Sequence, residues 1–209
     1  MYRVLCVYSS PRGERSRSIA ICEAFLKTYG ELHPEDEIDR LDLFGGDLPP
    51  FAGPALQAKY DILHDQPYSE EQSEAWKAIE EIIERFTTAD KYVFAVPMWN
   101  FGIPYRLKHY FDILVQPGYT FSYSPEEGYS GLVTGKPVFL AYARGGEYDE
   151  AAAQSVDMQK RYMELILGFI GLTDFRSVIV QPTIAGGPDV TQARMIAAVA
   201  RAEEMATDF

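Results

Sequence analysis

The sequence predicts an α/β fold in three layers, with a five-stranded parallel sheet between helices on both faces. Two observations support this prediction. Short apolar runs rich in β-branched and aromatic residues alternate along the whole chain with longer segments whose apolar residues recur at helical spacing. No internal repeat or low-complexity linker divides the 209 residues. Alternation of this kind is typical of parallel strands joined by helices, so we expect residues 1–209 to form one domain with a sizeable core.

The expected strands are short and are separated by turn-forming residues. They cover 4–8, 37–43, 92–96, 138–142 and 177–180. Residues 119–123 and 131–133 are expected to form a separate small hairpin. Segment 44–67 is rich in Gly, Pro and Asp and is longer than an ordinary connection, so we expect it to leave the sheet and return.

Helices are expected where apolar residues recur every three to four positions. These segments are 19–29, about 55–63, 69–87, 105–114, 158–170 and 193–205. Ser16 or Ser18 can cap the first of them, and Ser69 with Gln72 has the spacing of a capping box. Gly171 follows the helix at 158–170 and is expected to end it.

Composition and charge exclude several classes of function. The net charge of −12 and the pI of about 4.7 argue against binding to nucleic acid or to an anionic membrane. Cys6 and Cys22 lack the spacing of a metal site and lie in apolar periodic segments, which favours a reducing compartment over a disulfide framework. The N-terminal apolar run is too short for a secretory signal, and no later stretch is long enough to span a bilayer. We therefore expect a cytoplasmic protein without a nucleic-acid or membrane partner.

Residues 9–18, SSPRGERSRS, join the first expected strand to the first expected helix. Amides at a helix N-terminus bind phosphate, helped by the helix dipole and by hydroxyl donors. Arg12, Arg15 and Arg17 add local positive charge to an acidic chain. The segment has neither the dinucleotide fingerprint nor a P-loop, and hydroxyls in place of glycines favour a mononucleotide. Taken alone, the segment is more typical of an ordinary loop with a serine N-cap.

Two further loops follow expected strands. Residues 97–101, PMWNF, precede a Gly-Ile-Pro sequence, so their backbone cannot continue as a strand or a helix. Asn100 offers a donor and an acceptor for the pyrimidine edge or N5 of a flavin, while Met98 and Trp99 are suited to cover the ring. Residues 143–146, ARGG, form a turn that a ligand can approach closely. Because ligands of parallel sheets lie at the carboxyl ends of the strands, these loops and the serine-rich turn together predict a site for FMN.

A different enzyme is compatible with the first loop. Cys6 and Arg12 have the C-x5-R spacing of low-molecular-weight tyrosine phosphatases, in which a thiolate attacks and an arginine holds the phosphate. Cys6 lies inside an apolar strand, however, and Pro11 removes an amide that the anion needs. A buried structural cysteine is therefore favoured. An electron-carrier flavoprotein that does not turn over a nicotinamide is a second alternative.

In their combination and order, these segments resemble the FMN-dependent NADH-azoreductases, a branch of the flavodoxin-like NAD(P)H:quinone oxidoreductases. The resemblance covers nearly the whole chain. Beyond the serine-rich start it rests on PMWNF at 97–101, LKHYFD at 107–112, GYTFSY at 118–123, GLVTGK at 131–136, RGG at 144–146 and GFIGL at 168–172. It implies a flavodoxin-like fold, bound FMN, NADH or NADPH as electron donor, a quinone or azo compound as acceptor, and a homodimer.

The resemblance also implies roles for individual residues. The phosphate is expected at Ser10, Ser16, Arg17 and Ser18; the flavin at Pro97, Met98, Trp99, Asn100 and Phe101; and contacts to the isoalloxazine ring at Ala143, Arg144, Gly145 and Gly146. Phe121 is expected to form an aromatic wall of the substrate site at the subunit boundary, and Asn100 to face the substrate as well.

The implied reaction has two halves at one site. A hydride passes from the nicotinamide to flavin N5, the spent cofactor leaves, and the second substrate takes its place. We expect no side chain to protonate the product. His33 and His64 lie outside segments 9–18, 97–101, 118–123 and 143–146, and His109 is expected at a surface or interface. Tyr119, Phe121 and Tyr123 alternate on the expected hairpin, where one face either shields the flavin or simply packs.

Overall fold

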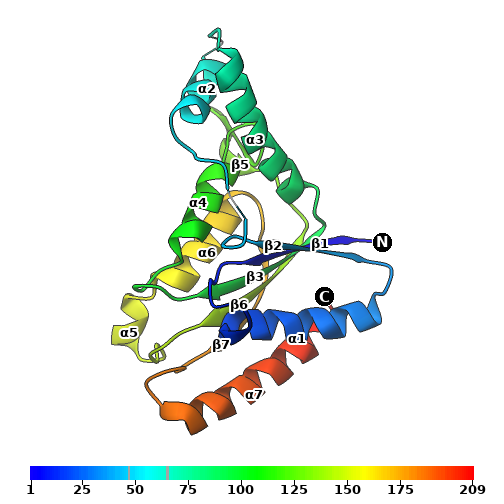
Figure 1. The fold of residues 1–209 in the computed structure, drawn as a ribbon, viewed down its shortest axis with the longest axis vertical. Coiled ribbons are helices and arrows are strands. Elements are labelled where there is room, and N and C mark those ends of the chain that lie inside the picture. The colour runs from blue at the N-terminus through cyan, green and yellow to red at the C-terminus, as the bar shows by residue number, and fades with distance from the viewer. Residues whose placement is uncertain (47, 65) are drawn as a thin grey trace.

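The computed structural model describes residues 1–46, 48–64 and 66–209 and contains the expected five-stranded parallel sheet. Its spatial order is β2-β1-β3-β6-β7 (Figure 1), and every neighbouring pair is parallel. The strands are β1 (Arg3–Tyr8), β2 (Glu37–Asp42), β3 (Lys91–Pro97), β6 (Pro137–Ala143) and β7 (Asp174–Val180). The chain runs outward from β1 to β2 and then returns to place β3 on the other side of β1. In flavodoxin-like sheets of this order, the carboxyl ends at this reversal form the ligand crevice.

Helices cover both faces of the sheet and give the three layers that the sequence predicts. One face carries α1 (Arg17–Leu32) and α7 (Gly187–Ala206), and the other carries α3 (Glu70–Thr87), α4 (Tyr105–Leu114) and α6 (Met158–Phe169) (Figure 1). The remaining helices are α2 (Pro54–Leu63), the short α5 (Ala151–Ser155) and a 3-10 turn, η1 (Gly13–Arg15). The expected excursion 44–67 contains α2, which packs on α3 at one end of the molecule, and residues 47 and 65 of it lie outside the described residues.

The two faces of the sheet bury separate hydrophobic clusters. The cluster under α1 and α7 includes Phe25, which stacks on Phe139 with ring centroids 4.0 Å apart. The larger cluster, under α3, α4 and α6, contains Trp76, Phe94 and Phe111. The inner strands β1, β3 and β6 are buried almost throughout, because a parallel sheet covered on both faces leaves no residue facing water.

The helix boundaries follow the capping signals of the sequence. Ser16 is the N-cap of α1, and its hydroxyl accepts a hydrogen bond from the amide of Ile19 at 3.4 Å. Ser69 and Gln72 form the expected capping box at the start of α3. Gly171 follows α6 with a φ of 108°, a conformation that side chains disfavour and that ends the helix there.

Two predicted boundaries are wrong. The hairpin consists of β4 (Phe121–Ser124) and β5 (Gly128–Gly131), so the expected second strand at 131–133 is displaced. Residues 131–133 pack instead against the end of α6, where the Val133 amide donates to the Ile170 carbonyl at 2.9 Å. A Cβ at Gly131 would collide with the backbone of Gly171, so the missing side chain allows this close approach. The last helix begins six residues earlier than the sequence predicts, because its first turn is polar and carries no apolar period.

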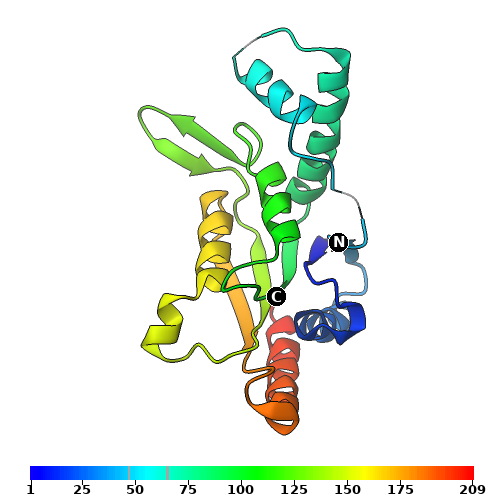
Figure 2. The same ribbon diagram turned by 60° about the vertical axis from the view of Figure 1, so that its left-hand side comes forward.

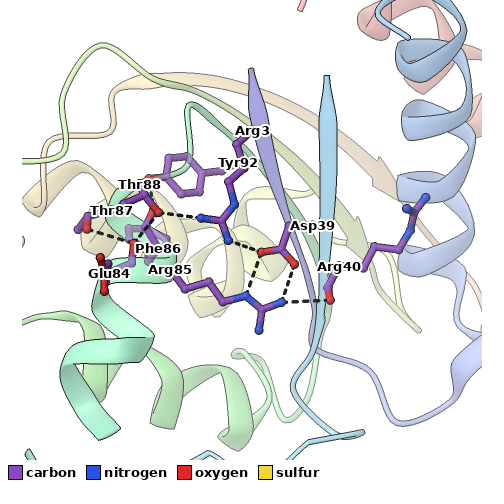
Figure 3. Close-up of polar contacts among 9 residues, drawn as sticks. All are labelled: Arg3, Asp39, Arg40, Glu84, Arg85, Phe86, Thr87, Thr88 and Tyr92. Carbon is purple, nitrogen blue, oxygen red and sulfur yellow. Dashed lines mark hydrogen bonds and ion pairs between the residues drawn. The ribbon is translucent and has the colours of Figure 1, made fainter. Parts of the chain in front are cut away.

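The edge strand β2 is held by ion pairs in addition to the packing of Ile38 and Leu41 on the two hydrophobic clusters. Asp39 lies between Arg85 on α3 and Arg3 on β1, with nitrogen–oxygen distances of 2.6 and 2.7 Å (Figure 3). Arg3 also donates to the hydroxyl of Thr88 at 2.8 Å. The side chains of the strand are half-buried or exposed, so these contacts add to the parallel ladder that joins β2 to β1.

Among the described residues, no helix is both long and apolar enough to cross a membrane.

Candidate functional site

Three of the predicted loops lie side by side because the strands before them are neighbours. In the order β1-β3-β6, β1 ends at Tyr8, β3 at Pro97 and β6 at Ala143. All three strands are parallel, so their carboxyl ends meet at one edge of the sheet. The Met98 amide donates to the Ala143 carbonyl at 2.8 Å and joins two of the loops directly. The fold therefore assembles 9–18, 97–101 and 143–146 into one site.

The serine-rich loop gathers buried hydroxyls at the start of α1. Ser10, Ser16 and Ser18 are all buried, and the hydroxyl oxygens of Ser16 and Ser18 are 3.2 Å apart. The first amides of a helix have no intrahelical acceptor. Ser16 satisfies the amide of Ile19, which leaves those of Arg17 and Ser18 for a ligand. Ser9 has a different part: its hydroxyl donates to the Ala95 carbonyl at 2.7 Å and closes the end of the sheet.

The arginines of this loop lie at its periphery. Arg12 and Arg15 are exposed, while Arg17 is half-buried and lines a cavity against Met195 and Ile196 of α7. The local positive charge is therefore spread around the helix N-terminus rather than directed into it.

Residues 99–102 form a tight turn that presents Asn100 and Phe101 to solvent. The amides of Trp99 and Gly102 each donate to the other residue's carbonyl at 2.9 Å. Between them, Asn100 and Phe101 have φ angles of 47° and 69°, the signature of a type I′ turn. A positive φ is uncommon for residues with side chains and is strained for an aromatic one. The Phe101 carbonyl in turn accepts from the Met158 amide at the start of α6, at 2.9 Å.

Trp99 belongs to an aromatic group beside this turn. Its ring centroid lies 5.8 Å from that of Phe44 and 6.3 Å from that of Tyr105. The edge-on contact of Phe44 with Tyr105, at 5.8 Å, completes the triangle. Sequence reasoning did not single out Phe44 or Tyr105, because nothing in the local pattern links them to the loop after β3.

In the 143–146 turn, Arg144 points inward. Its guanidinium is buried and donates to Asp157, Gln159 and Gln181. Ala143, Gly145 and Gly146 leave the outer side of the turn without a bulky side chain. The turn thus offers its backbone to a ligand, whereas the Arg144 side chain serves the interior.

Phe121 and Tyr123 lie on one face of the hairpin with Tyr129, whereas Tyr119 does not. Tyr119 lies before the strand and donates its hydroxyl to Glu80 of α3 at 2.5 Å. Phe121 is half-buried against Phe169 of α6, with ring centroids 4.9 Å apart. Tyr123 is exposed and contacts Tyr129 across the hairpin at 4.9 Å. Tyr129 and Phe169 complete this cluster, and neither was predicted.

A separate cavity of about 640 Å³ lies along α4. Its walls come from α4, α6 and the excursion before α3, and they include Tyr105, His109, Tyr162 and Lys59. Burial lowers the pKa of Lys59, whose ammonium lies 5.5 Å from the ring of Phe51. His109 is half-buried in this wall. His33 and His64 are the C-cap residues of α1 and α2.

Both cysteines are free and lie in the core, which argues against a phosphatase. Cys6 is fully buried in β1 beneath α1, away from Arg12 on the exposed loop. Cys22 is buried beside it, and burial raises the pKa of its thiol well above the ordinary value. Neither residue presents a thiolate to the loop that would bind a phosphate.

The donors at this edge fit FMN at both of its ends. The buried hydroxyls of Ser10, Ser16 and Ser18 and the free helix amides of Arg17 and Ser18 suit a phosphate. About the other end, the 97–101 and 143–146 turns offer backbone, an amide side chain and aromatic surface to a flat ring. The residues present therefore match a phosphorylated flavin.

Comparison with known proteins gives the same result. The family model described as "Flavodoxin-like fold" matches residues 2–206. The chain is 53% identical over 210 residues to an FMN-dependent NADH:quinone oxidoreductase of Nitratidesulfovibrio vulgaris, covering 100% of both chains. It superposes on an azoreductase structure from Bacillus anthracis with a TM-score of 0.91, 34% identity and complete coverage of both chains.

A second Bacillus anthracis structure, an FMN-dependent NADH-azoreductase in complex with FMN, has a TM-score of 0.87 and 27% identity, and the match covers 99% of this chain and 100% of that one. The 53% identity to the Nitratidesulfovibrio vulgaris protein over the full length shows common descent. The chain therefore belongs to the flavodoxin-like family that includes these FMN-dependent NADH:quinone oxidoreductases and azoreductases.

Proposed function

We propose that this protein is an FMN-dependent NADH:quinone oxidoreductase that also reduces azo compounds. The observation that carries the proposal is the meeting of three loops at the carboxyl ends of β1, β3 and β6, with phosphate donors at one end and a ring site at the other. The similarity to oxidoreductases and azoreductases over the whole chain supports it.

At the phosphate end, Ser10, Ser16 and Ser18 donate hydroxyl hydrogen bonds, and the amides of Arg17 and Ser18 point along the axis of α1. The positive end of the helix dipole favours the phosphate charge. The side chain of Arg17 contributes at longer range, because it packs partly against α7.

At the ring end, the backbone of 143–146 and the turn at 97–101 hold the flavin plane. Asn100 has both a donor and an acceptor for the polar edge of the ring. Met98 and Trp99 cover the ring, and Phe44 and Tyr105 keep water away from Trp99. Pro97 and Phe101 bound the turn on its two sides.

The mechanism follows from this arrangement. Bound FMN supplies the hydride-transfer chemistry, accepting from NADH and delivering to a quinone or azo compound. Residues 97–101 and 143–146 would hold the ring and leave it accessible to the two substrates in turn. We therefore propose a ping-pong sequence. No titratable side chain among the described residues that form the two turns is placed to protonate the product, so solvent supplies the proton.

We further propose that the protein works as a homodimer through the α6 face. Met158, Leu165 and Phe169 are spaced to lie along one stripe of α6, and Leu165 is 71% exposed. The Met158 end of the stripe is bonded to the 97–101 turn, and at its other end the ring of Phe169 lies 5.6 Å from that of Tyr129. The hairpin lies beside that end of α6 (Figure 2). A second copy on this stripe would bring its Phe121 and neighbouring aromatic rings to the open face of the flavin.

Two smaller proposals complete the picture. Residues 1–209 form one domain, because both hydrophobic clusters share the single sheet. The free thiols of Cys6 and Cys22 favour the reducing cytoplasm.

The proposed function is tested by steady-state kinetics with NADH as donor and a quinone or azo dye as acceptor. Double-reciprocal plots at several fixed acceptor concentrations should give parallel lines, the pattern of a ping-pong reaction. Intersecting lines would contradict the shared site, and a protein that binds FMN but does not oxidise NADH would be an electron carrier.

A further inference from the structure

The contacts of Arg144 tie the 143–146 turn to the start of α6. Its Nε donates to Gln159 Oε1 at 2.9 Å, Nη2 to Asp157 Oδ2 at 2.6 Å and Nη1 to Gln181 Oε1 at 3.2 Å. The side chain is buried. Arg144 cannot reach a flavin without breaking several charge-assisted hydrogen bonds in a low-dielectric interior. Its charge therefore organises the turn from behind.

Gln159 joins this cluster to the other flavin turn. Its side chain is fully buried, and Oε1 accepts from Arg144 while Nε2 donates to the Val96 carbonyl at 2.8 Å. Val96 is the residue before Pro97, where the turn begins. The bridge uses a donor and an acceptor on one short side chain, a combination that an amide supplies and a carboxylate or an alkyl group does not.

Asp157 fixes Gln159 in turn. As N-cap of α6, its Oδ1 accepts from the amides of Gln159 and Lys160 at 3.0 and 3.2 Å, and its other oxygen pairs with Arg144. The next residue, Met158, donates its amide to the Phe101 carbonyl. Both turns that hold the ring are thus bonded to the same three residues at the start of one helix.

We propose that Asp157 and Gln159 are positioning residues, which set the separation of the 97–101 and 143–146 turns and so the fit and electronic environment of the bound flavin. Neither side chain touches the ring; both act through Arg144 and Val96. This inference rests on the proposed FMN site. Nothing in the local sequence links the two residues to the flavin turns, because Asp157 has the pattern of a helix N-cap and Gln159 lies in the first turn of α6, outside every motif.

Three variants of the full-length protein test the inference. Gln159→Leu removes both bonds of the bridge. Asp157→Asn keeps an N-cap residue of similar capping strength and removes the charge that faces Arg144. For each, the measurements are the dissociation constant for FMN, the absorption bands of the bound flavin and its midpoint potential. We expect FMN binding to weaken by about tenfold, as the loss of a buried charge-assisted bond predicts, with shifted bands and potential.

The third variant, Gln159→Glu, keeps the proposal testable if Gln159→Leu does not fold. Its carboxylate accepts from Arg144 and has no hydrogen for the Val96 carbonyl, so it keeps one bond of the bridge and loses the other. FMN affinity of Gln159→Glu should therefore be lower than that of the wild type at neutral pH, with shifted absorption bands. Wild-type affinity and bands in this variant would contradict the bridge.

Asp39→Asn is the matched control, because it also removes a carboxylate between arginines but lies at the edge strand β2 (Figure 3). It should lower thermal stability and leave FMN affinity and spectrum unchanged. The inference is overturned if Gln159→Leu and Asp157→Asn keep wild-type affinity and spectrum, or if Asp39→Asn changes them equally. A wild-type protein that binds no FMN would instead overturn the proposed function itself, and this inference with it.

Discussion

Phe101 holds a left-handed backbone conformation that aromatic residues rarely adopt, with a φ of 69°. The two hydrogen bonds between Trp99 and Gly102 and the bond from Met158 to the Phe101 carbonyl fix it there. Strain of this kind persists only where the surrounding contacts enforce it. Since the side chain is more than half exposed, burial does not explain its presence, and we propose that it contacts the flavin or the substrate.

We predict that Phe101→Gly is more stable than Phe101→Ala by about 1 kcal/mol, because both remove the ring and only glycine accepts the positive φ without a penalty. Urea unfolding of the two variants measures the difference. Both should raise the KM for the quinone if the ring contacts the substrate. An alanine variant as stable as the glycine variant would show that the turn is not strained.

Single residues were the hardest scale to predict. The N-cap of α1 was narrowed to Ser16 or Ser18, because a capping signal lies within one helical turn of the amide that it bonds, and the structure shows that it is Ser16. Arg144 was expected at the ring on the basis of its motif, and the structure gives its side chain to Asp157 and Gln159 instead. Those partners are 13 and 15 residues away, beyond the range of any local pattern, so only the tertiary fold identifies them.

At the scale of elements, α1 is a helix whose first turn both folds the chain and forms the phosphate end of the site. Ser16 caps α1 and lies beside Ser18, whereas Ser69 caps α3 in the same way at a distance from the three loops. Comparing variants of Ser16 and Ser69 therefore distinguishes an effect on helix capping from an effect on ligand binding.

We predict that Ser16→Ala and Ser69→Ala each lower the free energy of unfolding by about 1 kcal/mol through the lost cap. Only Ser16→Ala should also weaken FMN binding, by about tenfold, because a hydroxyl donor to a charged group is lost. Thermal unfolding of the apoproteins and fluorescence titration with FMN measure the two effects. Equal FMN affinity in both variants would remove Ser16 from the site.

The edge strand β2 should make stability depend on pH. The guanidinium of Arg85, together with that of Arg3, holds the pKa of Asp39 below its ordinary value of 3.8. A carboxyl group whose pKa is lowered by folding stabilises the native state above its unfolded pKa and loses that contribution as the pH falls through the folded value. The effect therefore lies in the acid range.

We predict that Asp39→Asn lowers the free energy of unfolding by about 1–3 kcal/mol at neutral pH, where the carboxylate is bonded to both arginines. The difference between wild type and variant should shrink as the pH falls below about 4. Urea denaturation across the acid range gives both curves. A difference that stays constant down to about pH 2 would mean that the ion pairs do not stabilise β2.

At the scale of the whole molecule, the sequence predicts the architecture better than its details. The presence of five strands and their parallel direction follow from periodicity and connection length, which are local properties. The predicted bounds of the second hairpin strand were wrong, because Gly131 and Val133 are placed by contact with the end of α6. That contact lies some 40 residues further along the chain. The sequence predicted which loops meet at the strand ends, but it did not predict the side-chain contacts within them, such as those of Arg144.

The proposed dimer gives a prediction at the same scale. Leu165 on α6 and Ile196 on α7 are exposed by 71% and 62%, on helices that cover opposite faces of the sheet. Leu165→Glu should produce monomers, because a charge in an apolar interface is strongly unfavourable, and Ile196→Glu should leave the dimer intact. Sedimentation velocity distinguishes the two. A dimer that survives Leu165→Glu would exclude the α6 face.

One visible absorption experiment tests both the FMN site and the proposed reductase activity. The visible absorption of the purified protein supplied with FMN should show a bound flavin that bleaches when NADH is added without oxygen and recovers when a quinone is added. A bound flavin that NADH does not bleach would contradict the reductase, and a protein that binds no FMN would contradict the site at the ends of β1, β3 and β6.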